Sequence, residues 1–432
     1  MDIEKIKDTI NNTFDSWEVY YHKEHSKKFE SKEREICGIE MKEEEGIALR
    51  AVKDHKMVFT YTYEPDNAPE SLLSNATTLL PFMERDNDRL LPGKQDEYPV
   101  LSLYDYKGLK IDDEQKTALL LDMESAIRDY DKRIVTVRNC ELQEIEQQVK
   151  IRNSHGLIAE GANTLYTLSA YCVAKDKDEV SWYDWTWSHN FAELDGKKLA
   201  REIAQKTISF LSGKQIDTGV YEGILSPQAA CDMLGILSEA FLAENVFKNK
   251  TKLKGKENTE CFSEVITIID SGTMGIDSFP FDGEGIPSKE NIIVKNGYFK
   301  GFLYDSYYGH KYGVDSTGNS TRSGIKEPPK CGPRGTYINR GERDIGSILS
   351  NGVIIEELMG THTANPITGD FSLGTGGYIF KNGEKTPFQG VIFSGNVFEL
   401  FKNVKEVGND LKFYGVFGSP SLFVEGIKIS GK

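Results

Sequence analysis

The chain has 432 residues, with 52 Lys and Arg against 67 Asp and Glu, and its formal net charge is −15. A content of 38% hydrophobic and 28% charged residues is typical of a folded protein and excludes a disordered one. The acidic balance disfavours a general nucleic-acid binder, because the phosphate backbone repels such a surface.

The glycines divide the chain into two unlike halves. Of the 40 glycines, eight fall in residues 1–215 and 32 in residues 216–432. The length favours roughly two or three domains. We therefore expect an α+β fold with an N-terminal α+β domain over 1–215, built on an antiparallel sheet. A C-terminal β-rich domain over 216–432 follows, with antiparallel, barrel-like sheets and one long helix.

Targeting signals and cysteine pairs are both missing from the sequence. The opening MDIEKIKDTI lacks the apolar core of a signal peptide, and no run approaches the ~18 apolar residues of a membrane span. The six cysteines are far apart and form no CxxC pair, which predicts free thiols. These features favour a cytoplasmic protein without a membrane partner.

The first half reads as helices alternating with groups of strands. Residues 46–62 predict a hairpin with a turn at KDHK. The expected helices are 3–15, 66–84, 112–130 and 195–212. The expected further strands are 17–21, 34–42, 133–139, 145–153, 164–174 and 180–189.

The second half predicts one long helix and many short strands. Residues 227–247 form the helix, with Ser226 as N-cap and Pro227 in its first turn. Asn-Gly pairs at 296–297 and 382–383 indicate hairpin turns. The expected strands are 264–270, 291–295, 298–304, 352–359, 377–381, 387–394 and 421–429.

Two aromatic or histidine-bearing segments invite a functional interpretation. In the quartet HKEH, His22 and His25 are three apart in a β-type run and so point to opposite faces, which favours a solvated edge strand over a metal site. In 182–187, alternation places Tyr183, Trp185 and Trp187 on one face with His189. That face could stack a ligand, although packing on a helix or a partner subunit is favoured.

Polar loops in the second half are the main candidates for chemistry. The stretch 360–372 offers many short-range donors and acceptors between two strands, either as a ligand site or as a rigid turn network. In FDGEGIP, Asp282 and Glu284 could do acid–base work or bind a metal, or be solvated turn acids. The stretch 312–322 is a third such loop. The candidates in 360–372 are Thr361, His362, Thr363, Asn365, Asp370 and Ser372.

These motifs resemble the TldD/PmbA family over nearly the whole chain. The long, specific C-terminal signature is GTHTANPITGDFSLGTGGYIFKNGE followed by GVIFSGNVFELFKNV. The stretches FDGEGIP, DSTGNSTR and GIALRAV match in order and spacing. The resemblance implies an α+β N-terminal domain, a β-rich C-terminal domain and a peptide-processing zinc metalloprotease. An older name for the family is modulator of DNA gyrase.

The helix at 227–247 departs from the zinc-binding branch of that family. The TldD branch carries HExxxH there, whereas this helix has no His and the matching window is Leu234–Glu239. Cys231, Glu239 and Glu244 do not converge on one face. The chain therefore resembles the PmbA branch, also called TldE, which implies no cofactor on this chain and zinc in a TldD-type partner.

Three functions follow as hypotheses. The first is a non-catalytic or co-catalytic subunit of a peptide-processing metalloprotease, with the 360–372 loop at the peptide cleft or the subunit interface. The second is a homodimeric hydrolase with a non-standard site using His362, Asp282 and Glu284. The third is a binding or regulatory protein in the sense of the gyrase name, which the acidic charge makes the weakest.

Overall fold

The computed structural model describes residues 10–346, 348–381 and 384–432. Most of the helix expected at 3–15 lies outside these residues, as does the Asn-Gly pair at 382–383. The fold is α+β with mainly antiparallel sheets, as the sequence predicts. No helix in the described ranges is both long and apolar enough to cross a membrane.

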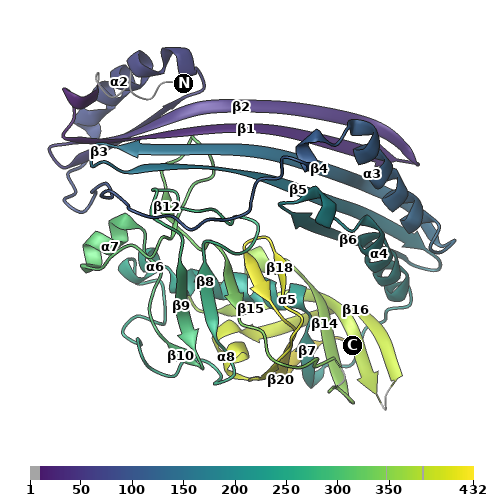
Figure 1. Ribbon diagram of the computed structural model, residues 1–432. Coiled ribbons are helices and arrows are strands. Elements are labelled where there is room, and N and C mark those ends of the chain that lie inside the picture. The colour runs from purple at the N-terminus through teal and green to yellow at the C-terminus, as the bar shows by residue number, and fades with distance from the viewer. Residues whose placement is uncertain (1–9, 347, 382–383) are drawn as a thin grey trace.

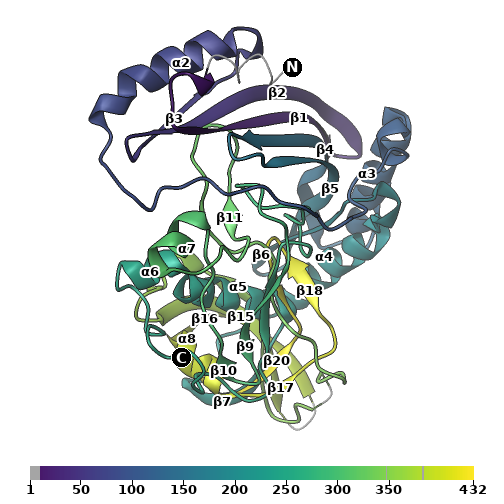
Figure 2. The same cartoon turned by 60° about the vertical axis from the view of Figure 1, so that its left-hand side comes forward.

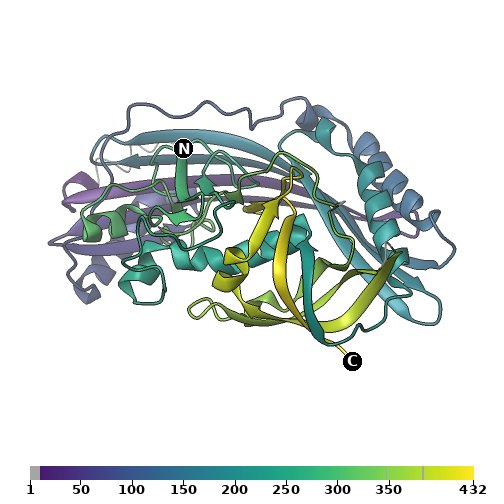
Figure 3. The ribbon, with the colours of Figure 1, turned by 90° about the horizontal axis from the view of Figure 1, so that it is seen from below.

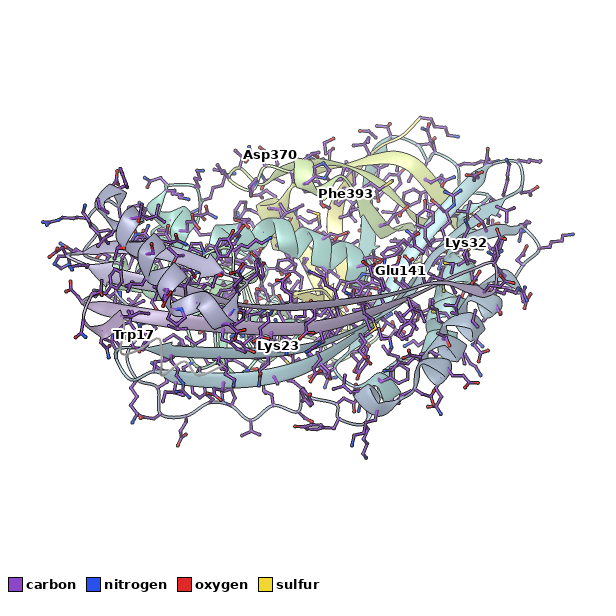
Figure 4. All side chains as sticks on the ribbon, turned by 90° about the horizontal axis from the view of Figure 1, so that it is seen from above. Trp17, Lys23, Lys32, Glu141, Asp370 and Phe393 are labelled. Atoms are coloured by element: carbon purple, nitrogen blue, oxygen red, sulfur yellow. The ribbon has the colours of Figure 1, made fainter. Side chains whose placement is uncertain are left out.

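A long sheet dominates the first half and runs along the length of the molecule (Figure 1). Its order is β3-β2-β1-β4-β5-β6, and every neighbouring pair is antiparallel. Figure 4 labels Trp17 and Lys32 near the two ends of β1. The strands are β1 (Ser16–Lys32), β2 (Glu35–Lys53), β3 (Lys56–Thr62), β4 (Ile134–Asn153), β5 (Ile158–Lys175) and β6 (Glu179–Ser188).

The strands are longer than the sequence pattern predicts. The strands expected at 133–139 and 145–153 are one strand, β4, which passes through an irregularity between Arg138 and Glu141. Asn139 has a φ of 47° there, so the alternation is interrupted although the pairing continues. The KDHK hairpin is confirmed: Asp54 and His55 both have positive φ, as a type I′ turn requires.

The HKEH segment is not on an edge strand, so that prediction was wrong. β1 pairs with β2 on one side and with β4 on the other. His22 is buried with its Nε2 2.8 Å from Gln147 Nε2, whereas His25 lies on the other face with Nε2 3.6 Å from Glu43. Charged residues along a strand indicate that one face of the strand is exposed. An interior strand of a sheet that is covered on one face also has an exposed face, so the charges do not identify an edge strand.

Three helices cover the long sheet. α2 (Ala68–Leu79) covers one end, and α3 (Asp113–Arg128) and α4 (Gly196–Phe210) cover the other (Figures 1 and 2). Asp112 and Asp195 cap α3 and α4 by accepting the Gln115 and Lys198 amides. The aromatic strand packs on α4 through the ring of Trp182, which stacks on Phe210, rather than through the face of Trp185.

The second half contains a closed sheet. Its order is β16-β15-β14-β7-β20-β17, and pairing of β16 with β20 closes a five-stranded barrel. β7 and β14 are parallel. The strands are β7 (Gly219–Leu225), β14 (Gly352–Met359), β15 (Asp370–Lys381), β16 (Glu384–Asn396), β17 (Val404–Val407) and β20 (Leu422–Ser430).

A further open sheet lies beside this barrel, with the order β10-β9-β8-β13-β19-β18. The Asn-Gly turn at 296–297 joins β9 to β10, as predicted. The strands are β8 (Ile268–Ser271), β9 (Glu290–Lys295), β10 (Tyr298–Phe299), β13 (Thr336–Ile338), β18 (Lys412–Tyr414) and β19 (Phe417–Ser419), with a separate pair β11 (Ser320–Thr321) and β12 (Lys330–Cys331).

The long helix expected at 227–247 is broken. α5 (Pro227–Ser238) passes into a 3₁₀ turn, η5 (Glu239–Phe241), and then α6 (Ala243–Phe247). Leu242 is extended and bridges to Leu303, which interrupts the helical hydrogen bonds. The other helices and turns are α7 (Ser306–Tyr312), α8 (Val397–Lys402), η1 (Pro65–Asn67), η2 (Leu80–Phe82), η3 (Gly108–Lys110), η4 (Phe191–Glu193) and η6 (Thr361–Thr363).

The apolar core of the second half surrounds α5. Leu234, Leu237 and Phe241 are fully buried against side chains from both of its sheets. α5 packs against β7 and β14 of the barrel and against β13, β18 and β19 of the open sheet. Figure 3 shows this half of the molecule from below, in front of the long sheet. The domain boundary at residue 215 stays a prediction.

Candidate functional site

Helix α5 has the capped start that the sequence predicts. Ser226 Oγ accepts the Ala229 amide at 3.3 Å, and Pro227 occupies the first turn. Leu234 is completely buried, while Asp232 and Gly235 lie on the partly exposed face. The helix therefore turns one face into the core and presents the other to a cavity.

That cavity, here called the α5 cavity, has a volume of about 540 Å³. It lies between α5, the 360–372 loop and strands β18 and β19. Its lining residues are Cys231, Asp232, Gly235, Ile236, Ser238, Glu239, Pro333, Thr361, His362, Ala364, Pro366, Tyr414 and Phe417.

Burial sets the ionisation of the groups along this cavity. It raises the pKa of the Asp232 carboxyl to about 6, with no cation to oppose the effect. Burial also raises the pKa of the Cys231 thiol to about 12, and its Sγ donates to the Phe417 carbonyl at 3.4 Å. Cys231 is thus an unreactive thiol at neutral pH, whereas Asp232 can exchange a proton near neutrality.

The structure brings two of the six predicted loop residues to the α5 cavity. Thr361 and His362 form part of η6 and line the cavity opposite α5. The other four hold the loop or lie on the strand that follows. Thr363 Oγ1 donates to the Gly360 carbonyl at 2.8 Å, and Asn365 Oδ1 accepts two amides, from Ile367 and Thr368.

Asp370 and Ser372 belong to the start of β15. Asp370 Oδ1 accepts a hydrogen bond from Asn396 Nδ2 at 2.8 Å, which together with Thr368 lowers the pKa of this carboxyl. Ser372 is exposed and opposite Ser394 of β16. Roles for all six residues stay predictions; the positions of Thr361 and His362 suit contact with a ligand best.

The donor set on α5 does not fit a zinc ion. Leu234 is apolar and buried, and a Cβ added at Gly235 would lie 3.3 Å from the Phe417 ring. Zinc requires about four N, O or S ligands in a tight tetrahedron. Within the described residues, no three His, Cys, Asp or Glu side chains are grouped to hold a metal ion.

Asp282 lies away from α5, where the second half meets the long sheet. Its Oδ1 accepts the Glu284 and Ile286 amides at 2.9 Å each, and its Oδ2 accepts the Ser320 amide at 3.0 Å. Burial, reinforced by Glu284, raises its pKa to about 6. It also lines a second cavity of about 280 Å³ beneath the long sheet, together with Tyr20 and Arg334.

Glu284 lies at one end of a buried ion-pair network that joins the two halves. Its Oε1 accepts Arg50 Nη1 at 2.8 Å, and its Oε2 accepts the Ser306 amide at 3.0 Å. Arg50 and Arg322 both pair with Glu18 of β1. Burial alone would raise the pKa of Glu284, but Arg50 holds it below its ordinary value. We call Glu18, Arg50, Glu284 and Arg322 the interlock network.

The sequence did not point to several residues of the α5 cavity and of the interlock network. Asp232, Tyr414 and Phe417 line the α5 cavity, and Arg50 and Glu18 complete the interlock network. A single acid within the otherwise apolar run 229–237 was a usable signal for Asp232. No local signal pointed to Tyr414 or Arg50, because their partners are far away in the chain.

Three family models match consecutive parts of the chain. They are the PmbA/TldA metallopeptidase domain 1 over residues 17–77, the central domain over 106–211 and the C-terminal domain over 218–431. α5 and the 360–372 loop both belong to the C-terminal match.

Curated relatives and solved structures agree with these matches. An uncharacterised protein of Methanocaldococcus jannaschii is 32% identical over 88% of each chain, and the metalloprotease PmbA of Escherichia coli is 26% identical over 72% of this chain and 68% of its own. A proposed modulator of a DNA gyrase from Thermotoga maritima is 25% identical with a TM-score of 0.90, covering 99% of this chain and 100% of its own. TldE from Thermococcus kodakarensis has the same fold, with a TM-score of 0.89 at 22% identity over 99% of both chains. This chain belongs to the PmbA/TldD metallopeptidase family.

Proposed function

We propose that this chain is a TldE-like subunit of a peptide-processing metallopeptidase, in which a TldD-type subunit supplies the zinc and this chain binds peptide or partner. The observation that carries the proposal is the face of α5. It presents Asp232 and Gly235 to a cavity, with Leu234 buried behind them, and offers no set of metal ligands. Such a cavity can hold part of a peptide without hydrolysing it.

Two free sheet edges flank this region and support binding of an extended peptide. β6 is the last strand of the long sheet, and β18 is the last strand of the open sheet. An edge strand presents unpaired N–H and C=O groups, to which a peptide main chain can add as a further strand. Thr361 and His362 would then contact side chains of that peptide in the α5 cavity.

Peptide cleavage by separate and combined subunits tests the proposal. The assay compares this chain, a family member carrying HExxxH, and an equimolar mixture, each with and without a zinc chelator. We expect cleavage that needs the HExxxH subunit and zinc and that rises when this chain is added. Metal-dependent cleavage by this chain alone would overturn the proposal.

Two loop variants separate binding from folding. The triple variant T361A/H362A/N365A should lower cleavage by the mixture, because it truncates Thr361 and His362 at the α5 cavity and also removes the Asn365 bonds that hold the loop. The double variant T361A/H362A keeps those bonds and should lower cleavage as well. The matched control N75A/T77A/T78A truncates exposed polar residues of α2, far along the chain, and should leave cleavage unchanged. Unchanged cleavage by both loop variants would remove 360–372 from the site.

The homodimeric hydrolase is less well supported. It needs His362, Asp282 and Glu284 to act together, but His362 lines the α5 cavity and Asp282 lines the cavity beneath the long sheet. Glu284 is already paired with Arg50. A gyrase-binding function would need a basic surface on the partner, because this chain carries a net charge of −15.

A further inference from the structure

A cavity of about 380 Å³, here called the β6 cavity, lies along the edge of the aromatic strand that pairs with no other strand among the described residues. Four elements line it: β6 itself, η4, the first turns of α4, and β18. Tyr414 lines both this cavity and the α5 cavity, so the two adjoin at its side chain. The residues of the β6 cavity are Asp184, Trp185, Thr186, Trp187, Glu193, Asp195, Lys198, Leu199, Glu202, Lys412, Phe413 and Tyr414.

Asp184 is a buried acid in this cavity without a side-chain partner. Only 5% of its surface is exposed, and its Oδ1 accepts the Trp185 amide at 2.8 Å. Within the described ranges, no side chain donates a hydrogen bond to its carboxylate, and no Lys or Arg nitrogen lies within 4.0 Å of it. A buried carboxylate in this state carries a desolvation cost that a cationic ligand would offset.

The other acids of the β6 cavity are already engaged. Glu193 accepts Ser188 Oγ at 2.6 Å, and Asp195 accepts the Lys198 amide as the cap of α4. Glu202 lies 4.0 Å from Lys412 Nζ. Asp184 and Asp195 each accept one backbone amide, but Asp195 is exposed and Asp184 is buried, so Asp184 is the acid of this cavity that gains most from an incoming donor.

The surroundings of Asp184 leave its carboxylate open to a further donor. The cavity is lined by four acids and two lysines. Lys206 and Lys412 oppose the rise that burial causes in the pKa of the Asp184 carboxyl, but neither nitrogen lies within 4.0 Å of it. Asp184 lies on the α4 face of β6 with Trp182, opposite Trp185 and Trp187, so an incoming cation would meet the carboxylate and not those two rings.

We propose that the β6 cavity is a subsite for a cationic group of a bound peptide, with Asp184 as the acceptor of its N–H bonds. The group is a Lys or Arg side chain, or the peptide amino terminus. The proposal rests on the peptide-binding function above and adds a substrate class to it: peptides with a positive charge near the segment that lies between β6 and β18.

Fluorescence anisotropy with the full chain measures this preference. The probes are labelled eight-residue peptides of Ala, Ser and Thr that are acetylated and carry one central Lys, norleucine or Glu. A fourth peptide lacks the central charge but has a free amino terminus. A charge-assisted hydrogen bond predicts that the Lys peptide binds ~10-fold more tightly than the norleucine peptide. Tight binding of the fourth peptide instead would identify the amino terminus as the cation.

The variant Asp184→Asn removes the charge and keeps the shape. It should bring the Lys and norleucine peptides to within ~2-fold of each other, since the charge-assisted bond is lost. The matched control Glu179→Gln removes an exposed charge at the start of the same strand and should keep the preference. A preference that survives Asp184→Asn, or that is absent from the unmodified chain, overturns the subsite.

Carbodiimide coupling gives a second measurement on the unmodified chain, in case the Asn variant does not fold. The reagent joins a peptide amine to a carboxylate in contact with it, and mass spectrometry locates the new amide. We expect the Lys peptide to couple to Asp184, and coupling only to other acids contradicts the subsite. If the norleucine peptide binds and the Lys peptide binds no more tightly, the subsite proposal fails and the proposed function is not affected. If no peptide binds, with or without the HExxxH subunit, the proposed function fails with it.

Discussion

Glu284 of the interlock network and His362 at the α5 cavity have opposite environments although both lie in polar loops that contain glycine. Glu284 is 3% exposed and bonded to Arg50 and to the Ser306 amide. His362, in contrast, is exposed at the mouth of a cavity. Residue type therefore does not distinguish a loop that stabilises the fold from a loop that can bind a ligand. Burial and the number of hydrogen bonds already made distinguish the two.

Arg50→Met should cause the largest loss of stability. It leaves Glu18 and Glu284 buried with fewer partners, and breaking a buried ion pair costs about 3–5 kcal/mol. Urea unfolding followed by circular dichroism measures the change. The control Lys23→Met removes a surface pair with Glu43 and should cost less than about 1 kcal/mol. Equal losses in the two variants would contradict the structural role of the interlock network.

Asp305→Asn should have a smaller, pH-dependent effect. Burial, reinforced by Glu284, raises the pKa of Asp305 to about 7, against about 3.9 for an unfolded chain. Between these values the folded state keeps the proton and the unfolded chain has lost it, so the fold loses stability as pH rises from about 3.9 to about 7 and loses little more above that. Asn cannot ionise and still caps α7 by accepting the Tyr308 amide.

Melting temperatures of both proteins at pH 5, 7 and 8.5 check this expectation. The stability of the Asn variant relative to the unmodified chain should rise by roughly 1–3 kcal/mol across the series. A difference independent of pH would mean that Asp305 keeps its ordinary pKa in the fold.

Gly235→Ala should change stability slightly, and in the favourable direction. Glycine inside a helix costs about 1 kcal/mol relative to alanine. The new Cβ would lie 3.3 Å from the ring of Phe417, which is partly exposed and can move aside. We expect a gain below about 1 kcal/mol in urea unfolding. A loss would show that Phe417 is fixed and that the α5 cavity is rigid on this side.

The double variant T361A/H362A should have the smallest effect on stability. Neither side chain is buried, so the free energy of unfolding should stay within about 0.5 kcal/mol of the unmodified value. The same variant is expected to lower peptide cleavage in the mixed assay. A large loss of stability would show that this loop, like the interlock network, stabilises the fold.

Local signals made much of the fold predictable. Ser226 caps α5 as the sequence predicts, because a cap acts within three residues. The helices expected from 112 and from 195 begin one residue later, and Asp112 and Asp195 are their caps. The KDHK and 296–297 turns follow from residues that accept positive φ. The length of β4 and the break after Ser238 were missed, since a bulge and the Leu242–Leu303 bridge depend on distant strands.

The candidate site was predictable only in part. The motifs located the 360–372 loop and α5, and hence Thr361 and His362. They placed Glu284 among the site candidates as well, although it is paired with Arg50, 234 residues away in the sequence. From the sequence, Asp184 could be recognised only as an acid within an aromatic strand. Its lack of a side-chain partner could not be predicted, because it depends on how α4 and β18 pack around it.

Residues close together in the chain were enough to establish the family, the Ser226 cap, the turns at KDHK and 296–297 and the lack of histidine on the helix at 227–247. Which polar loop is buried and which borders a cavity depends on the tertiary packing. The tertiary packing also decides that Tyr414 joins the α5 cavity to the β6 cavity. The physical reason is that burial and hydrogen-bond saturation are set by the elements packed around a side chain, and those elements come from distant parts of the chain.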